Sequence, residues 1–303
     1  MRAPLRRATT MTQPRFLQLD VFTHKPGGGN PLGVVFDAND WTGERMQAFA
    51  AWVNLVETTF VLPPSSDAAS YRARIFTPTR EIPFAGHPTV GTAHAVLELG
   101  VAAPRDGQLV QECGAGLLPV RVEHDARGRL LFVEAPHAKV LREGLDDFAL
   151  WAVLDGVALG RLPPAFVEGG RRWWLAELAS EAALREWKPD HVAIGMLARA
   201  SGSLGLCAFA RAPRGSEYDV VVRAFPSGVG IIEDPASGAA NGLLAAYIAH
   251  REPGGPLARG YRVSQGREIG RDATLLIRIE LNGAIWVGGH VQTVIGGGGL
   301  LWP

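Results

Sequence analysis

Three polar side chains lie where the sequence pattern predicts that a helix or a strand begins. In REIPFAGHPTVGTAHAVLELG, residues 80–100, His87 lies between a glycine and a proline, just ahead of a helix-like pattern. In EDPASGAANG, Asp234 also precedes a proline at an expected helix start, and Glu57 opens the apolar stretch ETTFVL. Imidazole and carboxyl groups are common proton carriers in enzymes. Acid–base chemistry is therefore the first hypothesis.

Both elbows also suit the binding of a carboxylate. Proline is favoured in the first helical turn because its missing N–H is not needed there. A helix N-terminus offers free N–H groups and a partial positive charge to an anion. Small residues that let a ligand approach the backbone surround both elbows: Gly86, Gly91, Gly238, Ala239 and Ala240. If the two helix starts face each other, they bracket one small-molecule site between two lobes.

Each of the three residues has a plainer structural interpretation. His87 taken alone is typical of a capping or packed histidine. Asp234, just before a proline, fits an ordinary helix N-cap. Glu57 fits a rim glutamate on an exposed strand end as well as it fits a desolvated acid with a raised pKa. The pairing of the two elbows by an internal repeat favours the catalytic interpretation.

The elements expected around these residues are strands and helices in both halves of the 303-residue chain. Apolar alternation predicts strands over 16–22 and 32–36 around a Gly/Pro/Asn turn, and then a helix with Thr42 as its N-cap. Further helices are predicted over 87–100, 182–200 and 235–250. This order predicts an α+β fold.

A weak internal repeat relates the two halves. A shift of 147 residues without a gap superposes four identical pairs: Tyr71 on Tyr218, Pro88 on Pro235, Gly91 on Gly238 and Ala93 on Ala240. The same shift pairs His87 with Asp234. Aligning ETTF with LCAF puts Leu206 opposite Glu57, at a shift two residues longer than 147. The acid therefore occurs in one half only. The repeat predicts two similar lobes, each with a central helix. Two unrelated α+β domains with common helix-start chemistry are the alternative.

Composition excludes several classes of protein. The formal net charge is zero, which argues against broad attraction to nucleic acid or anionic membrane, and no apolar run is long enough to span a bilayer. Cys113 and Cys207 cannot form a disulfide framework, and neither they nor the eight histidines show metal-ligand spacing. We therefore predict a cytoplasmic protein without a metal. Residues 1–14 are expected to form a disordered tail, with Met11 as the candidate true start. A transit peptide is the alternative.

Five stretches together resemble the phenazine-biosynthesis PhzF family: LDVFTHKPGGGNPLGVV, NLVETTFV, RIFTPTREIPFAGHPTVGTA, QECGAGLLPV and EDPASGAANG. The resemblance extends from about Phe16 to the end of the chain. It implies a diaminopimelate-epimerase-like fold of two pseudo-symmetric lobes, each a mixed or antiparallel sheet wrapped round a central helix. It also implies a homodimer that needs no cofactor. Lobe one is expected to comprise 15–128 plus 292–303, and lobe two 129–291.

The resemblance implies roles for individual residues. The acid–base glutamate of the family falls on Glu57, its site histidine on His87 and its substrate-binding aspartate on Asp234. Backbone groups near Gly86 and Gly238 are expected to bind the carboxylate of the substrate. Asn30 and Ala239 are expected to line the same site.

The best-known activity of the family moves a proton between ring carbons of trans-2,3-dihydro-3-hydroxyanthranilate. This chain has Ala239 where the isomerase pattern has a serine, and Ser237 lies two positions earlier. One hydrogen bond of about 0.5–1.5 kcal/mol is therefore missing. Racemases of this fold use two cysteines at the helix starts, which these elbows lack. An isomerase of a small carboxylate is the first hypothesis. An epimerase of another small acid and a catalytically silent binding protein are the alternatives.

Overall fold

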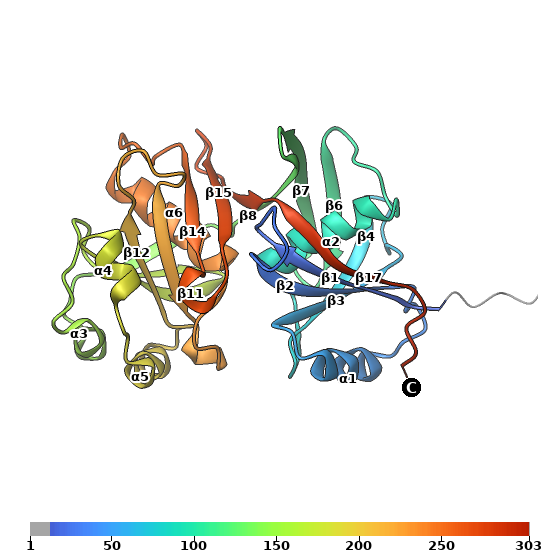
Figure 1. The fold of residues 1–303 in the computed structure, drawn as a ribbon, viewed down its shortest axis with the longest axis horizontal. Coiled ribbons are helices and arrows are strands. Elements are labelled where there is room, and N and C mark those ends of the chain that lie inside the picture. The colour runs from blue at the N-terminus through green and yellow to red at the C-terminus, as the bar shows by residue number, and fades with distance from the viewer. Residues whose placement is uncertain (1–12, 303) are drawn as a thin grey trace, which may run out of the picture.

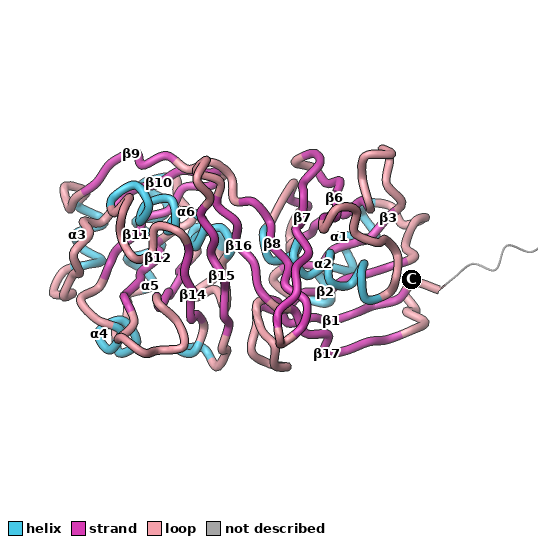
Figure 2. Tube along the Cα trace, turned by 90° about the horizontal axis from the view of Figure 1, so that it is seen from above, coloured by secondary structure: helices cyan, strands magenta, loops and turns pink. Residues whose placement is uncertain are grey.

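The computed structural model describes residues 13–302, and the lobes lie side by side in Figures 1 and 2. Most of the predicted tail, with Met11, lies outside these residues. Pro14 accepts a hydrogen bond from the N–H of Leu300, so the packed chain begins before residue 15. Within the described range, no helix is long and apolar enough to cross a membrane.

Lobe one is a curved sheet around helix α2 (Gly86–Glu98). The strands pair in the order β17-β1-β2-β3-β4-β6-β7-β8, and β2–β3 and β4–β6 are parallel. Helix α1 (Gly43–Val53) covers the outside, and Thr42 caps it as predicted. The strand bounds are β1 Arg15–Val21, β2 Asn30–Phe36, β3 Glu57–Leu62, β4 Tyr71–Phe76, β5 Glu81–Ile82, β6 Gln108–Cys113, β7 Gly116–Asp125, β8 Gly128–Glu134 and β17 Val291–Gly297.

Lobe two repeats this plan around helix α6 (Gly238–Arg251). Its strands pair in the order β9-β10-β11-β12-β13-β14-β15-β16, and helices α3 (Phe148–Leu154), α4 (Glu181–Glu186) and α5 (His191–Ser201) lie outside the sheet. The strand bounds are β9 Lys139–Glu143, β10 Ala165–Gly169, β11 Arg171–Glu177, β12 Leu206–Arg211, β13 Val220–Phe225, β14 Gly260–Gln265, β15 Ala273–Ile279 and β16 Ile285–Gly289.

Two strands connect the lobes. β8 pairs with β7 of lobe one along one edge and with β16 of lobe two along the other. After β16 the chain returns to lobe one, where β17 pairs antiparallel with β1, as Figure 1 shows in red and blue. Because β8 pairs with a strand of each lobe, the strand pairings do not place a boundary between the lobes at residue 128. The limits of 15–128 plus 292–303 and 129–291 stay a prediction.

Two local predictions were wrong. The single helix predicted over 182–200 is broken into α4 and α5, because Pro189 cannot continue a helix and Asp190 caps the second one by accepting from two backbone N–H groups. β9 and β10 were not predicted at all. Three of the five β9 residues are exposed, so this edge strand lacks the apolar alternation on which the prediction depended.

Both central helices are buried because their small and apolar residues face sheet on every side. In α2 the buried residues include Val90, Ala93 and Val96, and in α6 they include Leu244 and Ile248. Burial of such side chains contributes about 1.5–3 kcal/mol for each large apolar residue. This packing fixes where the two helices start, at the junction between the lobes.

Candidate active site

The N-termini of α2 and α6 face each other across the junction. A Cβ atom added to Gly86 would lie 3.7 Å from the Cα of Gly238, and the reverse substitution gives the same distance. Since glycine occupies the first position of both helices, the backbones approach with only enough room for a small group between them. The two helix starts therefore lie next to each other at the junction between the lobes.

The pairing of His87 with Asp234 was wrong. His87 is the second residue of α2, whereas Asp234 lies four residues before α6 begins. The offset between the first helical residues is 238 − 86 = 152, not 147, so His87 corresponds to Ala239. Asp234 is not a helix N-cap either, because Ser237 caps α6 by accepting from the N–H of Ala240. Ser237 is the N-cap, whereas Ala239 lies within the first helical turn, so the Ser237 hydroxyl does not occupy the position of the missing serine.

Glu57 is the first residue of β3, and Leu206 is the first residue of β12, which confirms their alignment. The Glu57 side chain is only 13% exposed, which excludes a rim glutamate. Burial, and then the neighbouring charge of Asp234, raises the pKa of Glu57 from 4.5 to about 8. At pH 7 about a tenth of this carboxyl is ionised, so the group can both accept and donate a proton.

His87 lies directly beside Glu57, with 3.4 Å between Nε2 and Oε2, and its side chain is 8% exposed. Burial lowers the pKa of His87 to about 3, and a hydrogen bond to the carbonyl of Pro31 only partly opposes the shift. Both groups are therefore mainly uncharged at pH 7, and their contact is not an ion pair. Since the hydrogen bond to Pro31 places the ring proton on the other nitrogen, the Nε2 that faces Glu57 carries a lone pair and can accept a hydrogen bond from the neutral carboxyl.

Asp234 is held by the other lobe. The side-chain amide of Asn30, the first residue of β2, donates to Asp234 Oδ1 at 2.9 Å and to the carbonyl of Ala236 at 2.9 Å. Because both partners are acceptors, the amide nitrogen is assigned without ambiguity. Burial raises the pKa of Asp234 to about 6, while hydrogen bonds from Ala236, Ser237 and Asn30 oppose the rise.

Three buried side-chain atoms of this group have no hydrogen-bond partner within residues 13–302: Asn30 Oδ1, Glu57 Oε2 and His87 Nε2. An unsatisfied buried polar atom costs about 1–3 kcal/mol, so native proteins rarely leave such atoms together outside functional sites. A ligand with its own donors and acceptors would satisfy them. The arrangement suits a small polar molecule that binds beside a proton-transfer group.

Ala239 and the cysteines complete the set of predicted residues. Ala239 is exposed in the first turn of α6. Cys113 ends β6, and Cys207 is fully buried in β12, so neither lies at a helix start. In the part of the chain that the structure describes, no group of three His, Cys, Asp or Glu side chains is arranged to hold a metal ion.

Sequence reasoning missed two residues beside the site. Phe22 has a φ of 66°, which is strained for a bulky residue, and its ring lies 3.8 Å from the place of a Cβ on Gly238. Gln265 ends β14 and is fully buried against the segment before α6. The only sequence signal for Gln265 is its place at the end of a strand pattern, where a polar residue is followed directly by Gly266.

The chain forms two lobes with Glu57, His87 and Asp234 at their junction, and it is similar to known proteins. The phenazine biosynthesis-like protein family, PhzC-PhzF, matches residues 19–297. Antisense-enhancing sequence 1 of Schizosaccharomyces pombe is 31% identical over 296 residues, which cover 95% of this chain and 99% of that protein. Trans-2,3-dihydro-3-hydroxyanthranilate isomerase of Pseudomonas aeruginosa is 36% identical over 267 residues, which cover 88% and 90%.

A solved structure agrees. The PhzF-family protein of Bacillus anthracis matches with a TM-score of 0.78 and 27% identity over 96% of this chain and 99% of that one. The chain belongs to the phenazine biosynthesis-like PhzF family, which confirms the resemblance, and the fold class is confirmed as well. Several relatives are named isomerases, and this protein is an isomerase.

Proposed function

We propose that this isomerase moves a proton between two carbons of a small carboxylate, with Glu57 as the acid–base group. The observation that supports this most directly is the buried Glu57 carboxyl, whose raised pKa places it near neutrality, 3.4 Å from a neutral His87. A proton carrier works best when its pKa is close to the working pH.

The carboxylate of the substrate binds at the facing helix starts. The first N–H groups of α2 and α6 have no partner inside their own helices, and Gly86 and Gly238 leave the backbone accessible. Two helix N-termini supply the positive potential that a buried carboxylate needs. This anchoring sets the reacting carbons beside Glu57.

Proton transfer follows from that placement. The ionised Glu57 removes a proton from one carbon, and the resulting neutral carboxyl returns it to another carbon of the same substrate. His87 faces Glu57 and stays neutral, so its Nε2 can accept a hydrogen bond from Glu57 whenever that carboxyl is protonated. Asp234, held by Asn30, orients a polar group of the substrate and raises the pKa of Glu57 through its charge.

The substrate proposed first is trans-2,3-dihydro-3-hydroxyanthranilate, the compound named for relatives that are 34–36% identical. A second candidate is epimerisation of another small acid. The exposed Ala239 favours it, because the helix start lacks the serine hydroxyl, and so does the second carboxyl with a raised pKa, Asp234. We also propose that the protein acts as a cytoplasmic homodimer without a cofactor, which sedimentation and assays of metal-free protein would test.

The deciding experiment is proton NMR of dihydro-3-hydroxyanthranilate in deuterated buffer. The wild type should consume the compound with deuterium incorporation, and Glu57→Gln should lose both activities. Glu217→Gln is a matched control, because Glu217 is exposed and distant in the sequence from every site residue. Full turnover by Glu57→Gln would reject the assignment. Exchange of other amino or hydroxy acids, with none for this compound, would favour the epimerase.

A further inference from the structure

We propose that Gln265 is a positioning residue that fixes the segment Asp234–Ser237, and with it both the Asp234 carboxyl and the first turn of α6. The inference rests on the proposed function, since that function gives Asp234 and the helix start their roles. Gln265 itself touches no reacting group, so it would act only through this segment.

Gln265 makes three hydrogen bonds, and it is fully buried. Its Nε2 donates to the carbonyl of Asp234 at 2.8 Å, and its Oε1 accepts from the N–H of Ser237 at 3.2 Å. The same oxygen accepts from Asn241 Nδ2 at 2.9 Å, and Asn241 also donates to the carbonyl of Ser237. One amide therefore spans the segment from the acidic residue to the helix cap.

Lobe one repeats the arrangement with different residues. Gln111 in β6 is also fully buried, and its Nε2 donates to Thr89 Oγ1 at 3.0 Å. Thr89 is the fourth residue of α2, as Asn241 is of α6, and its hydroxyl donates back to the carbonyl of Ala85. Two lobes with little sequence in common thus use a buried glutamine to fix the first turn of the central helix. A role tied to the helix start explains this recurrence better than local packing does.

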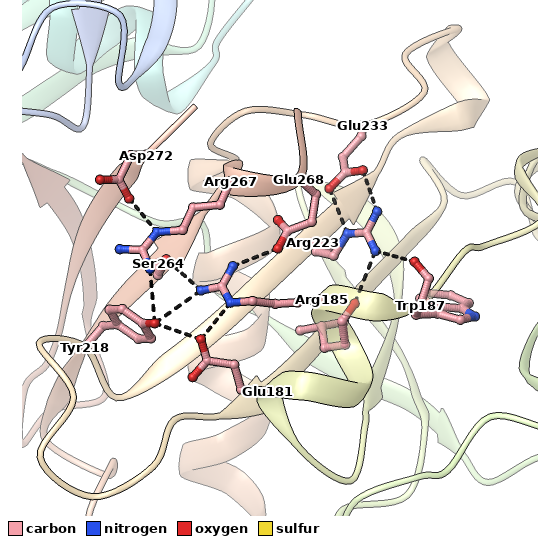
Figure 3. A network of polar contacts seen from close by, with 11 residues as sticks. Glu181, Arg185, Trp187, Tyr218, Arg223, Glu233, Ser264, Arg267, Glu268 and Asp272 are labelled. Carbon is pink, nitrogen blue, oxygen red and sulfur yellow. Dashed lines mark hydrogen bonds and ion pairs between the residues drawn. The ribbon is translucent and has the colours of Figure 1, made fainter. Parts of the chain in front are cut away.

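The same segment is also anchored on its other side. Figure 3 shows Arg223 bound through two nitrogens to Glu233, the residue before Asp234, at 2.9 Å each. Arg223 also donates to the carbonyls of Leu184 and Trp187. Behind Gln265, a Cβ on Gly266 would come within 2.6 Å of the carbonyl oxygen of Pro235. The segment can shift only when one of these contacts is released. Asn30 and the carbonyl of Ala224 also bond Asp234, but Gln265 is the side chain that joins Asp234 to the helix cap Ser237.

The test compares Gln265→Met with Ser264→Ala. Methionine has a similar size but leaves the Asp234 carbonyl and the Ser237 N–H unpaired. Ser264 precedes Gln265 in β14, is equally buried and accepts instead from Arg185, a contact drawn in Figure 3. Ser264→Ala loses one side-chain hydrogen bond and Gln265→Met loses three in the same strand, so the Tm of each variant is measured beside its activity. Assays are run well below the melting temperature of each variant.

We expect Gln265→Met to lower kcat at least tenfold, since a small misplacement of a catalytic group can cost up to about a hundredfold. Ser264→Ala should stay within twofold. Gln265→Glu at pH 6 should recover part of the loss, because a buried protonated carboxyl keeps one donor and one acceptor. Calorimetry with 3-hydroxyanthranilate, an aromatic analogue of the proposed substrate, should show weaker binding to Gln265→Met than to Ser264→Ala.

The outcomes separate this inference from the proposed function. If Glu57→Gln is inactive while Gln265→Met keeps wild-type kcat, KM and ligand affinity, the positioning role is wrong and the proposed function stands. Equal losses in Gln265→Met and Ser264→Ala would also overturn it, since they would reflect stability alone. If the wild type neither binds the analogue nor exchanges a proton of any small acid, the proposed function fails and this inference fails with it.

Discussion

Glu57→Gln should stabilise the protein while it abolishes turnover, and the gain should grow with pH. The pKa of Glu57 is 4.5 in an unfolded chain and about 8 in the folded one. A carboxyl with a raised folded pKa favours folding fully below pH 4.5, and this contribution is lost as the pH rises through 8. Glutamine is neutral at every pH, so the variant escapes that loss.

The magnitude follows from the linkage of protonation to folding. Each pH step between the two pKa values corresponds to about 1.36 kcal/mol. At pH 5 the two proteins should differ little, because Glu57 is then mostly neutral in the folded state. At pH 7, 2.5 steps above 4.5, Glu57→Gln should be more stable by about 3 kcal/mol, and above pH 8 by about 5 kcal/mol.

Urea denaturation of both proteins at pH 5, 7 and 8.5 measures this difference. His87, whose pKa is lowered, destabilises the folded state at acid pH in both proteins and so cancels in the comparison. Glu217→Gln serves again as the exposed control and should show no growing gap. If the difference in unfolding free energy between Glu57→Gln and wild type stays constant from pH 5 to 8.5, ionising the buried Glu57 carboxyl does not destabilise the folded protein, and the reasoning is refuted.

Three further predictions concern the helix starts and the tie between the lobes. Ala239→Ser, at an exposed position, should raise kcat/KM for dihydro-3-hydroxyanthranilate about two- to tenfold, and no change would show that the hydroxyl is not needed here. Gly238→Ala meets its neighbours at ordinary distances of 3.7–3.8 Å, so we expect an unchanged Tm but a raised KM; a large loss of Tm would contradict this. Asn30→Leu leaves the carbonyl of Ala236 without this donor, whereas Asp234 Oδ1 keeps the N–H of Ala236, so the variant should cost about 1–3 kcal/mol in urea denaturation. It should also raise the pKa of Asp234 in the pH profile, and an unmoved acid limb would count against the bond.

The sequence predicted the types of element better than their correspondence between the lobes. Glu57 and Leu206 align because each opens a strand with a clear apolar pattern, at an offset of 149 residues. Between β4 and α2 there are nine residues, 77–85, but between β13 and α6 there are twelve, 226–237. Those three extra residues change the helix offset to 152. The coincidence of Pro-x-x-Gly-x-Ala concealed this insertion, because proline and glycine are common near helix starts.

Contacts between distant segments could not be predicted from local patterns. Asn30 and Asp234 are 204 residues apart, and their bond exists only because β2 and the segment before α6 meet at the junction. The same holds for Gln265, whose partners lie on another element. The raised pKa of Glu57 is equally a property of the folded surroundings. Strand periodicity can suggest that a residue is buried, but not which charge will lie beside it.

The pairing of β17 with β1 has a consequence for folding during synthesis on the ribosome. Strand β1 starts at Arg15, near the beginning of the chain, whereas β17 ends at Gly297, near its end. During synthesis the edge of β1 that pairs with β17 therefore stays unpaired until almost every residue of the second lobe has been made. Unpaired strand edges are prone to wrong pairing with other chains. A nascent chain that stalls before residue 291 should thus be a target for chaperones. Because lobe one contains both β1 and β17, dividing the chain into two fragments at any one position between them leaves neither fragment with a complete lobe one.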